Sequence, residues 1–138
     1  MKATYKNFLI RSKFTGSKQA PWGNYSKKLG LPENWNHNRV TVKNTETGKQ
    51  TGFDFWGSIV NPEPETEYAV LNAFYCFVSD AVIGDMEFAE FCREFGYDED
   101  SRKAEKTWKA CQRATVKLER IYDGDVGDLA NELQEVAG

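Results

Sequence analysis

The sequence predicts a single α+β domain, residues 1–138, in which a small antiparallel sheet packs against three to four helices. Two observations predict this class. Apolar residues recur at every second position in parts of residues 1–60, which is the period of a strand. In residues 66–122 they recur at every third or fourth position, which is the period of a helix. Between these halves, "NPEPETE" contains two prolines that interrupt regular structure.

The strands are predicted from short alternating stretches in the N-terminal half. "TYKNFLIRSKF" alternates loosely, and a second short strand is expected at residues 22–26. "HNRVTVKN" and "TGFDFWGSI" flank a turn that contains glycine, so residues 40–56 are predicted to form a β-hairpin. "LGLPENWNH", residues 29–37, is rich in turn formers and predicts a loop.

The helices are predicted from periodicity and from residues that cap helix ends. Thr66 can cap a helix that runs to about residue 82, is apolar nearly all round and ends at Gly84. Asp85 can cap a short helix that ends before Gly96, where a left-handed residue is expected. The next helix is expected from Asp98 or Asp100 to residue 122. Residues 123–138 predict an acidic tail or a short helix.

Charge divides the chain more sharply than its net value of −3 indicates. Residues 1–56 carry ten Lys or Arg and three acids, a net of +7, whereas residues 57–138 carry eight Lys or Arg and eighteen acids, a net of −10. Such a division indicates charged partners, or attraction between the two halves. Three widely spaced cysteines, the lack of a long apolar run and the lack of a secretory signal predict a cytoplasmic protein.

The motifs give no indication of an enzyme. His37 is the only histidine, and it lies in a polar stretch with no nucleophile motif beside it. The acids around Gly96 and in "DGDVGD" miss the spacing of a calcium loop, and no phosphate-binding glycine motif is present. We therefore predict no catalytic residue, no metal site and no cofactor.

The strongest functional pattern is a row of basic side chains, lysines and arginines, on the helix that is expected to end near residue 122. At about 100° per residue the six bases fall within an arc of about 80°, opposite the predicted buried face, and span about 27 Å. No acid falls within the arc. Three explanations remain: an acidic external partner such as nucleic acid, the acidic elements of the chain itself, or solvent. This basic stripe comprises Arg102, Lys106, Lys109, Arg113, Lys117 and Arg120.

Two further sets of residues are candidates for binding. Aromatic residues in the basic half could stack on unpaired bases, although packing in the core is the simpler interpretation; they are Trp22, Tyr25 and Trp35. The acids near the C-terminus could imitate the phosphates of nucleic acid; they are Asp123, Asp125, Asp128, Glu132 and Glu135.

"FDFWGSI" and "EFCREFGYDEDSRKAEKTWKAC" resemble segments of small proteins encoded by bacteriophages and prophages, which share an aromatic strand and this type of helix junction. The resemblance covers about residues 38–122 and carries no functional residue with it. Small phage proteins with polarised charge often resemble counter-defence inhibitors, including anti-CRISPR proteins. The resemblance therefore implies location in the host cytoplasm.

These observations favour a non-enzymatic inhibitor that binds a host defence protein or ribonucleoprotein, such as an RNA-guided nuclease, through charged surfaces. Direct contact with nucleic acid is part of that hypothesis, and no membrane partner is expected. One alternative is a phage accessory protein that binds single-stranded nucleic acid. A second is a small metal-dependent hydrolase. The sequence leaves the oligomeric state open, a homodimer included.

Overall fold

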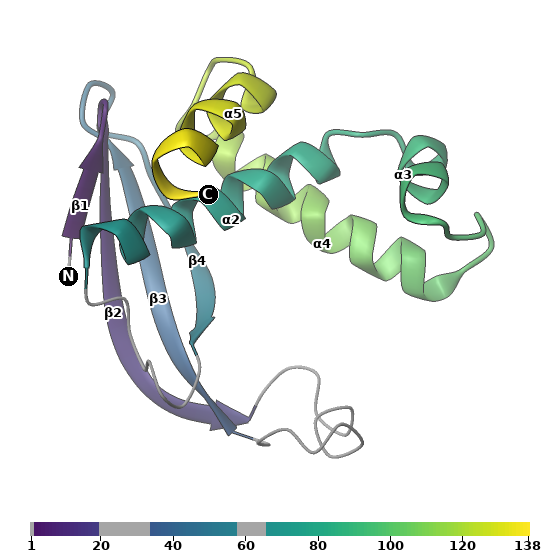
Figure 1. Ribbon diagram of the computed structural model, residues 1–138, viewed down its shortest axis with the longest axis horizontal. Coiled ribbons are helices and arrows are strands. Elements are labelled where there is room, and N and C mark those ends of the chain that lie inside the picture. Colours follow the sequence, from purple (N-terminus) through teal and green to yellow (C-terminus); the bar gives the residue numbers. More distant parts are fainter. Residues whose placement is uncertain (1, 20–33, 58–65) are drawn as a thin grey trace.

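The computed structural model describes residues 2–19, 34–57 and 66–138 and confirms the predicted α+β class. A four-stranded antiparallel sheet has the order β1-β2-β3-β4, and the helices follow it in the chain (Figure 1). The strands are β1 (Lys2–Tyr5), β2 (Phe8–Gln19), β3 (Asn34–Asn44) and β4 (Gln50–Gly57). The helices are α2 (Glu67–Gly84), α3 (Phe88–Phe95), α4 (Arg102–Glu119) and α5 (Val126–Ala137).

The first predicted strand is divided into two. A turn at Lys6 and Asn7 separates β1 from β2, and Lys6 adopts a left-handed φ of 51° there. Tyr5 then pairs with Phe8, so the chain folds back on itself within the stretch that was expected to be continuous. Loose alternation in the sequence did not mark this turn, because it contains neither glycine nor proline.

The predicted hairpin is confirmed as β3 and β4, but the loop predicted at residues 29–37 is wrong for Asn34 to His37. These four residues belong to β3 and pair with β2, Asn36 with Ser17 for example. Pairing with a neighbouring strand thus overrides their polar composition. The rest of that loop and the strand predicted at residues 22–26 lie outside the described residues.

The core lies between one face of the sheet and the helices α2 and α5. Phe8, Ile10, Val40 and Val42 are at most 2% exposed and come from that face. Phe53 of β4 stacks on Phe77 of α2 with ring centroids 4.3 Å apart. Alternate residues of the same strands therefore point away from the helices, onto a second face of the sheet.

A second part of the molecule extends away from the sheet as a helical arm, formed by α2, α4 and α3 (Figure 1). Where α2 and α4 run side by side, the Thr115 hydroxyl donates a hydrogen bond to the Ala81 carbonyl over 2.7 Å. At the far end of the arm, Trp108 Nε1 donates to the Met86 carbonyl over 2.9 Å, and α3 packs beside it. These contacts fix the orientation of α4 and therefore the direction of the side that faces away from α2.

The helix ends are partly as predicted. Thr66 caps α2, and Gly96 ends α3 with a φ of 72°. The cap of α4 is Ser101, whose hydroxyl accepts from the Ala104 amide, and neither Asp98 nor Asp100. Asp85 ends α2 and does not begin α3, which starts after Glu87 without a side-chain cap.

Residues 126–137 form the helix α5, so the short-helix alternative holds for this part of the chain. None of the described helices is by itself long and apolar enough to cross a membrane. The apolar α2 and the adjoining α3 would reach that length only together, and they are bent by 116° where they join.

Candidate functional site

The basic stripe lies on the side of α4 that faces away from α2. Ala104, Cys111, Thr115 and Leu118 are buried on the opposite side, as the periodicity predicted. Of the six bases, five are exposed and Lys117 is half-buried. The structure therefore brings all six predicted residues together on one accessible surface.

One member of the stripe has an acidic partner. Lys109 Nζ lies 2.8 Å from a carboxylate oxygen of Glu105, one helical turn away. Glu105 stands beside the predicted arc, so the stripe is bordered by an acid at this point. For the other five bases, no acid of the described residues lies within ion-pair distance. The described part of the chain thus leaves most of the stripe uncompensated.

The C-terminal half of the stripe surrounds a shallow apolar depression. Val116, which is 53% exposed, lines this depression together with Gln112, Arg113, Lys117 and Arg120. An exposed valine among cations gives this surface an apolar contact in addition to its charge.

The predicted acidic surface lies on α5 and in the segment before it. All five of its residues are exposed. Asp125 caps α5 by accepting from the Asp128 amide. Glu132 is 2.5 Å from Lys6 Nζ and accepts from the Tyr5 hydroxyl, and its hydrogen bond with Lys6 lowers the pKa of its carboxyl group. These contacts are directed toward β1, so α5 does not cover the basic stripe.

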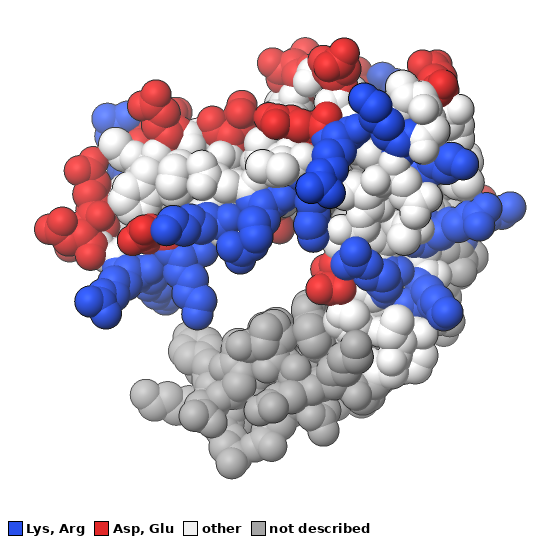
Figure 2. Space-filling view, turned by 180° about the vertical axis from the view of Figure 1, so that it is seen from behind, with Lys and Arg blue, Asp and Glu red and all other residues white. Residues whose placement is uncertain are grey.

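The two signs of charge occupy different sides of the molecule. Figure 2 shows Lys and Arg side chains along the lower edge of the helical arm and again over the sheet. Asp and Glu gather mainly along the upper edge. Charge is therefore divided in space, although the basic residues of the arm belong to the acidic half of the sequence. Among the described residues, the ion pair of Lys6 with Glu132 joins an acid of α5 to the N-terminal half.

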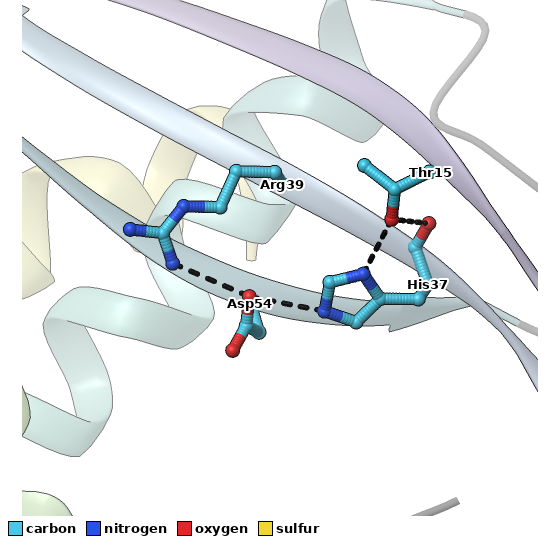
Figure 3. Close-up of polar contacts among 4 residues, drawn as sticks. All are labelled: Thr15, His37, Arg39 and Asp54. Carbon is cyan, nitrogen blue, oxygen red and sulfur yellow. Dashed lines mark hydrogen bonds and ion pairs between the residues drawn. The ribbon is translucent and has the colours of Figure 1, made fainter. Parts of the chain in front are cut away.

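His37 has partners that sequence reasoning missed (Figure 3). It lies on β3, 7% exposed, with Nδ1 2.5 Å from the Thr15 hydroxyl and Nε2 3.0 Å from Asp54. Asp54 also lies 3.2 Å from a guanidinium nitrogen of Arg39. Thr15 is the extra residue of a β-bulge, since the pairing of β2 with β3 shifts between Phe14 and Gly16.

The order threonine, histidine, aspartate matches that of a nucleophile, a base and an orienting acid. However, the Thr15 hydroxyl also lies 2.9 Å from the His37 carbonyl and can donate its one proton there. A hydroxyl that donates to this carbonyl does not give its proton to Nδ1, and that hydrogen bond is the one that a nucleophile and its base require. This geometry suits a polar clamp across three strands. No sequence motif marks it, because only the strand register brings its members together.

The remaining candidates add no site. Cys92 and Cys111 are buried and Cys76 is exposed, and burial raises the pKa of the Cys111 thiol. Within residues 2–19, 34–57 and 66–138, no three His, Cys, Asp or Glu side chains are arranged to hold a metal ion. Trp22 and Tyr25 lie outside the described residues. Trp35 is on β3, opposite Lys18, but its side chain is outside the description.

No protein family, no curated protein and no solved structure was found to match this chain.

Proposed function

We propose that this protein is a non-enzymatic binding protein whose basic stripe on α4 contacts the phosphates of nucleic acid. The observation that carries the proposal is a row of six basic residues along one helix side, five of them exposed, of which only Lys109 has an acidic partner among the described residues. Phosphate groups supply the opposite charge at high density, and their release of counterions favours binding at low salt.

The stripe has a cost that solvent alone does not explain. Each base stands three or four residues from the next, and like charges at that spacing destabilise a helix by about 0.2–0.5 kcal/mol per pair. A helix side that only faces water usually carries both signs. The cost of this arrangement is offset when a polyanion covers the stripe.

The position of the stripe favours contact with the backbone over the reading of a duplex sequence. Recognition helices place their N-terminal residues against base edges in the major groove. The turn before α4 carries Asp98, Glu99 and Asp100, which repel phosphates at that end. The long side of α4, with Val116 exposed among its bases, suits a single strand or the exposed nucleic acid of a ribonucleoprotein.

The biological role that we propose is inhibition of a host defence complex that contains nucleic acid, such as an RNA-guided nuclease. The resemblance of residues 38–122 to small phage proteins supports this role, together with the lack of an enzymatic motif in the sequence. A phage accessory protein that binds single strands would use the same stripe. A metal-dependent hydrolase has no supporting observation among the described residues.

The test combines inhibition with binding. The double variant Lys106→Glu/Arg113→Glu reverses two exposed bases that lie two turns apart on the stripe. We expect this variant to lose the ability to inhibit the RNA-guided nucleases that protect the host from phage. We also expect that a pull-down with this variant recovers no ribonucleoprotein from host lysate. The matched control is Arg93→Glu/Lys103→Glu, which makes the same charge change at exposed positions outside the arc.

Inhibition that survives in the Lys106→Glu/Arg113→Glu variant would exclude the stripe and favour the acids of α5 as a phosphate mimic. Loss of inhibition with Asp128→Asn/Glu135→Gln would then identify that surface. Binding of free single strands without inhibition of any nuclease would assign the accessory role instead.

A further inference from the structure

The sheet has a second face that the helices do not cover, and its exposed side chains are mainly bases. Residues that alternate with the buried ones along β1, β2 and β3 point to this outer face. Each of its bases is exposed. Together they form the sheet surface, which comprises Lys2, Arg11, Lys13, Arg39 and Lys43.

The strand register places two pairs of these bases directly opposite each other. Lys2 pairs with Arg11 across β1 and β2, and Lys13 pairs with Arg39 across β2 and β3. Like charges in directly opposed positions destabilise a sheet. If this surface only faced water, replacing one member of either pair with an acid would stabilise the sheet. The like-charged pairs therefore indicate that an external anion binds here.

On the described strands, this face has one acid, Asp54, and that acid is already engaged. Its carboxylate lies between His37 Nε2 at 3.0 Å and an Arg39 nitrogen at 3.2 Å (Figure 3). The Arg39 guanidinium lies close over Gly52, where a Cβ would stand 2.8 Å from it. Asp54 thus neutralises one base, while Lys2, Arg11, Lys13 and Lys43 keep their full charge.

The spacing of the surface fits a chain of anions. Bases two residues apart on one strand lie about 7 Å from each other, and neighbouring strands are about 5 Å apart. Leu9 and Thr41 lie between Arg11 and Lys43 and line a shallow depression with them. An open, positively charged surface can follow the phosphate backbone of a single nucleic-acid strand.

We propose that this sheet surface is a second nucleic-acid-binding surface, which takes the phosphodiester backbone of a single strand, and that Asp54 weakens it by occupying Arg39. This inference takes its class of ligand, nucleic acid, from the proposed function, but it assigns the binding to the sheet surface in addition to the basic stripe. Binding therefore involves two basic surfaces, and each can be removed without the other.

The experiment measures the affinity of the full-length protein for a labelled 20-nucleotide single strand of mixed sequence, as RNA and as DNA, and for the matched duplex. Salt is varied from 50 to 200 mM. Four variants are compared with the wild type. They are Arg11→Gln/Lys13→Gln on the sheet surface, Lys106→Gln/Arg113→Gln on the stripe, Arg93→Gln/Lys103→Gln as the control for net charge, and Asp54→Asn. Thermal unfolding of each variant verifies that it is folded.

If two phosphate contacts are lost, the magnitude of the negative slope of log affinity against log salt for a single strand falls by about 1.4. We expect this fall for Arg11→Gln/Lys13→Gln, with affinity reduced about eightfold per contact at 50 mM salt, and no comparable change in the control. Asp54→Asn is expected to increase the magnitude of this slope by about 0.7, because Arg39 becomes available. A gain in affinity is a result that partial unfolding would not produce.

The outcomes separate the two surfaces. If Arg11→Gln/Lys13→Gln behaves like the control while Lys106→Gln/Arg113→Gln weakens binding, the sheet surface is excluded and the stripe stands. The reverse result excludes the stripe as the phosphate contact and supports the sheet surface. Tighter binding of the duplex than of the single strands would overturn the assignment to a single strand, and failure of the wild type to bind any of the three probes would overturn the sheet surface.

Discussion

Gly84 of α2 lies against the backbone of Cys111 in α4 so closely that a Cβ at Gly84 would stand 2.2 Å from the Cys111 carbonyl oxygen. The same Cβ would stand 2.4 Å from the Thr115 hydroxyl, which is hydrogen-bonded to Ala81. The two helices therefore cross where one of them has no side chain. This crossing sets the direction of the helical arm and of the stripe that α4 carries.

We expect Gly84→Ala to destabilise the protein by at least about 1–3 kcal/mol, because the added methyl group meets backbone that cannot move without separating the helices. Urea unfolding followed by circular dichroism measures this loss. The control is Gly127→Ala in α5, where a Cβ would meet only a side-chain oxygen of Asp125, at 3.1 Å. Equal stability of the Gly84→Ala variant and the wild type would contradict the close crossing.

Ser101→Ala tests the observed start of α4. The Ser101 hydroxyl accepts from the Ala104 amide over 3.2 Å, so its removal leaves a helix-end donor without its cap. We expect a loss of about 1 kcal/mol in the free energy of unfolding. Asp100→Ala is the comparison, because Asp100 is one of the two caps, with Asp98, that the sequence predicted. A larger loss with Asp100→Ala than with Ser101→Ala would place the cap back at Asp100.

The ion pair of Lys6 with Glu132 predicts a dependence of stability on pH. The pKa of Glu132 is lowered by its hydrogen bond with Lys6, and the pKa of Lys6 is raised by the same bond. A lowered carboxyl pKa gives stability that is present above the unfolded pKa of about 4.5 and is lost as pH falls through the folded pKa. A raised amine pKa gives stability that is lost as pH rises through it, above about 10.5.

Glu132→Gln should therefore lower the thermal midpoint between about pH 5 and 10, and this effect should shrink as the pH falls below the unfolded pKa of about 4.5. Both side chains are exposed, so we expect a small shift that salt reduces further. Glu135→Gln, which removes an exposed charge from the same helix, is the control. A shift that does not shrink as the pH falls below about 4.5 would mean that Glu132 acts through packing and not through its charge.

The features of the fold that were predicted correctly are those that depend on residues close together in the sequence. The buried side of α4, its stripe and the left-handed Gly96 were predicted, because each depends on residues within a few turns of one another. The turn at Lys6 was missed because lysine and asparagine gave only a weak signal there. Helix caps were misplaced by one to three residues where several polar residues stood side by side.

The outer face of the sheet could not be predicted, because it depends on register. His37, Thr15 and Asp54 come from three strands, and the bulge at Thr15 shifts one strand against the next. The opposition of Lys2 to Arg11 likewise follows from the turn at Lys6, which the sequence did not indicate. Once the register is known, the charge on this face follows from simple alternation.

The stripe itself predicts an effect on stability that is opposite to its effect on binding. Lys106 stands about one turn from Arg102, Lys103 and Lys109, so Lys106→Gln removes three repulsive pairs. We expect a gain of a few tenths of a kcal/mol in the free energy of unfolding at 10 mM salt. The gain should disappear at 1 M salt, where the Debye length is about 3 Å. Lys103→Gln, outside the stripe, should give a smaller gain. If Lys106→Gln instead destabilised the protein at low salt, Lys106 would have a stabilising partner. The repulsion within the stripe, which the proposed binding is expected to offset, would then be contradicted.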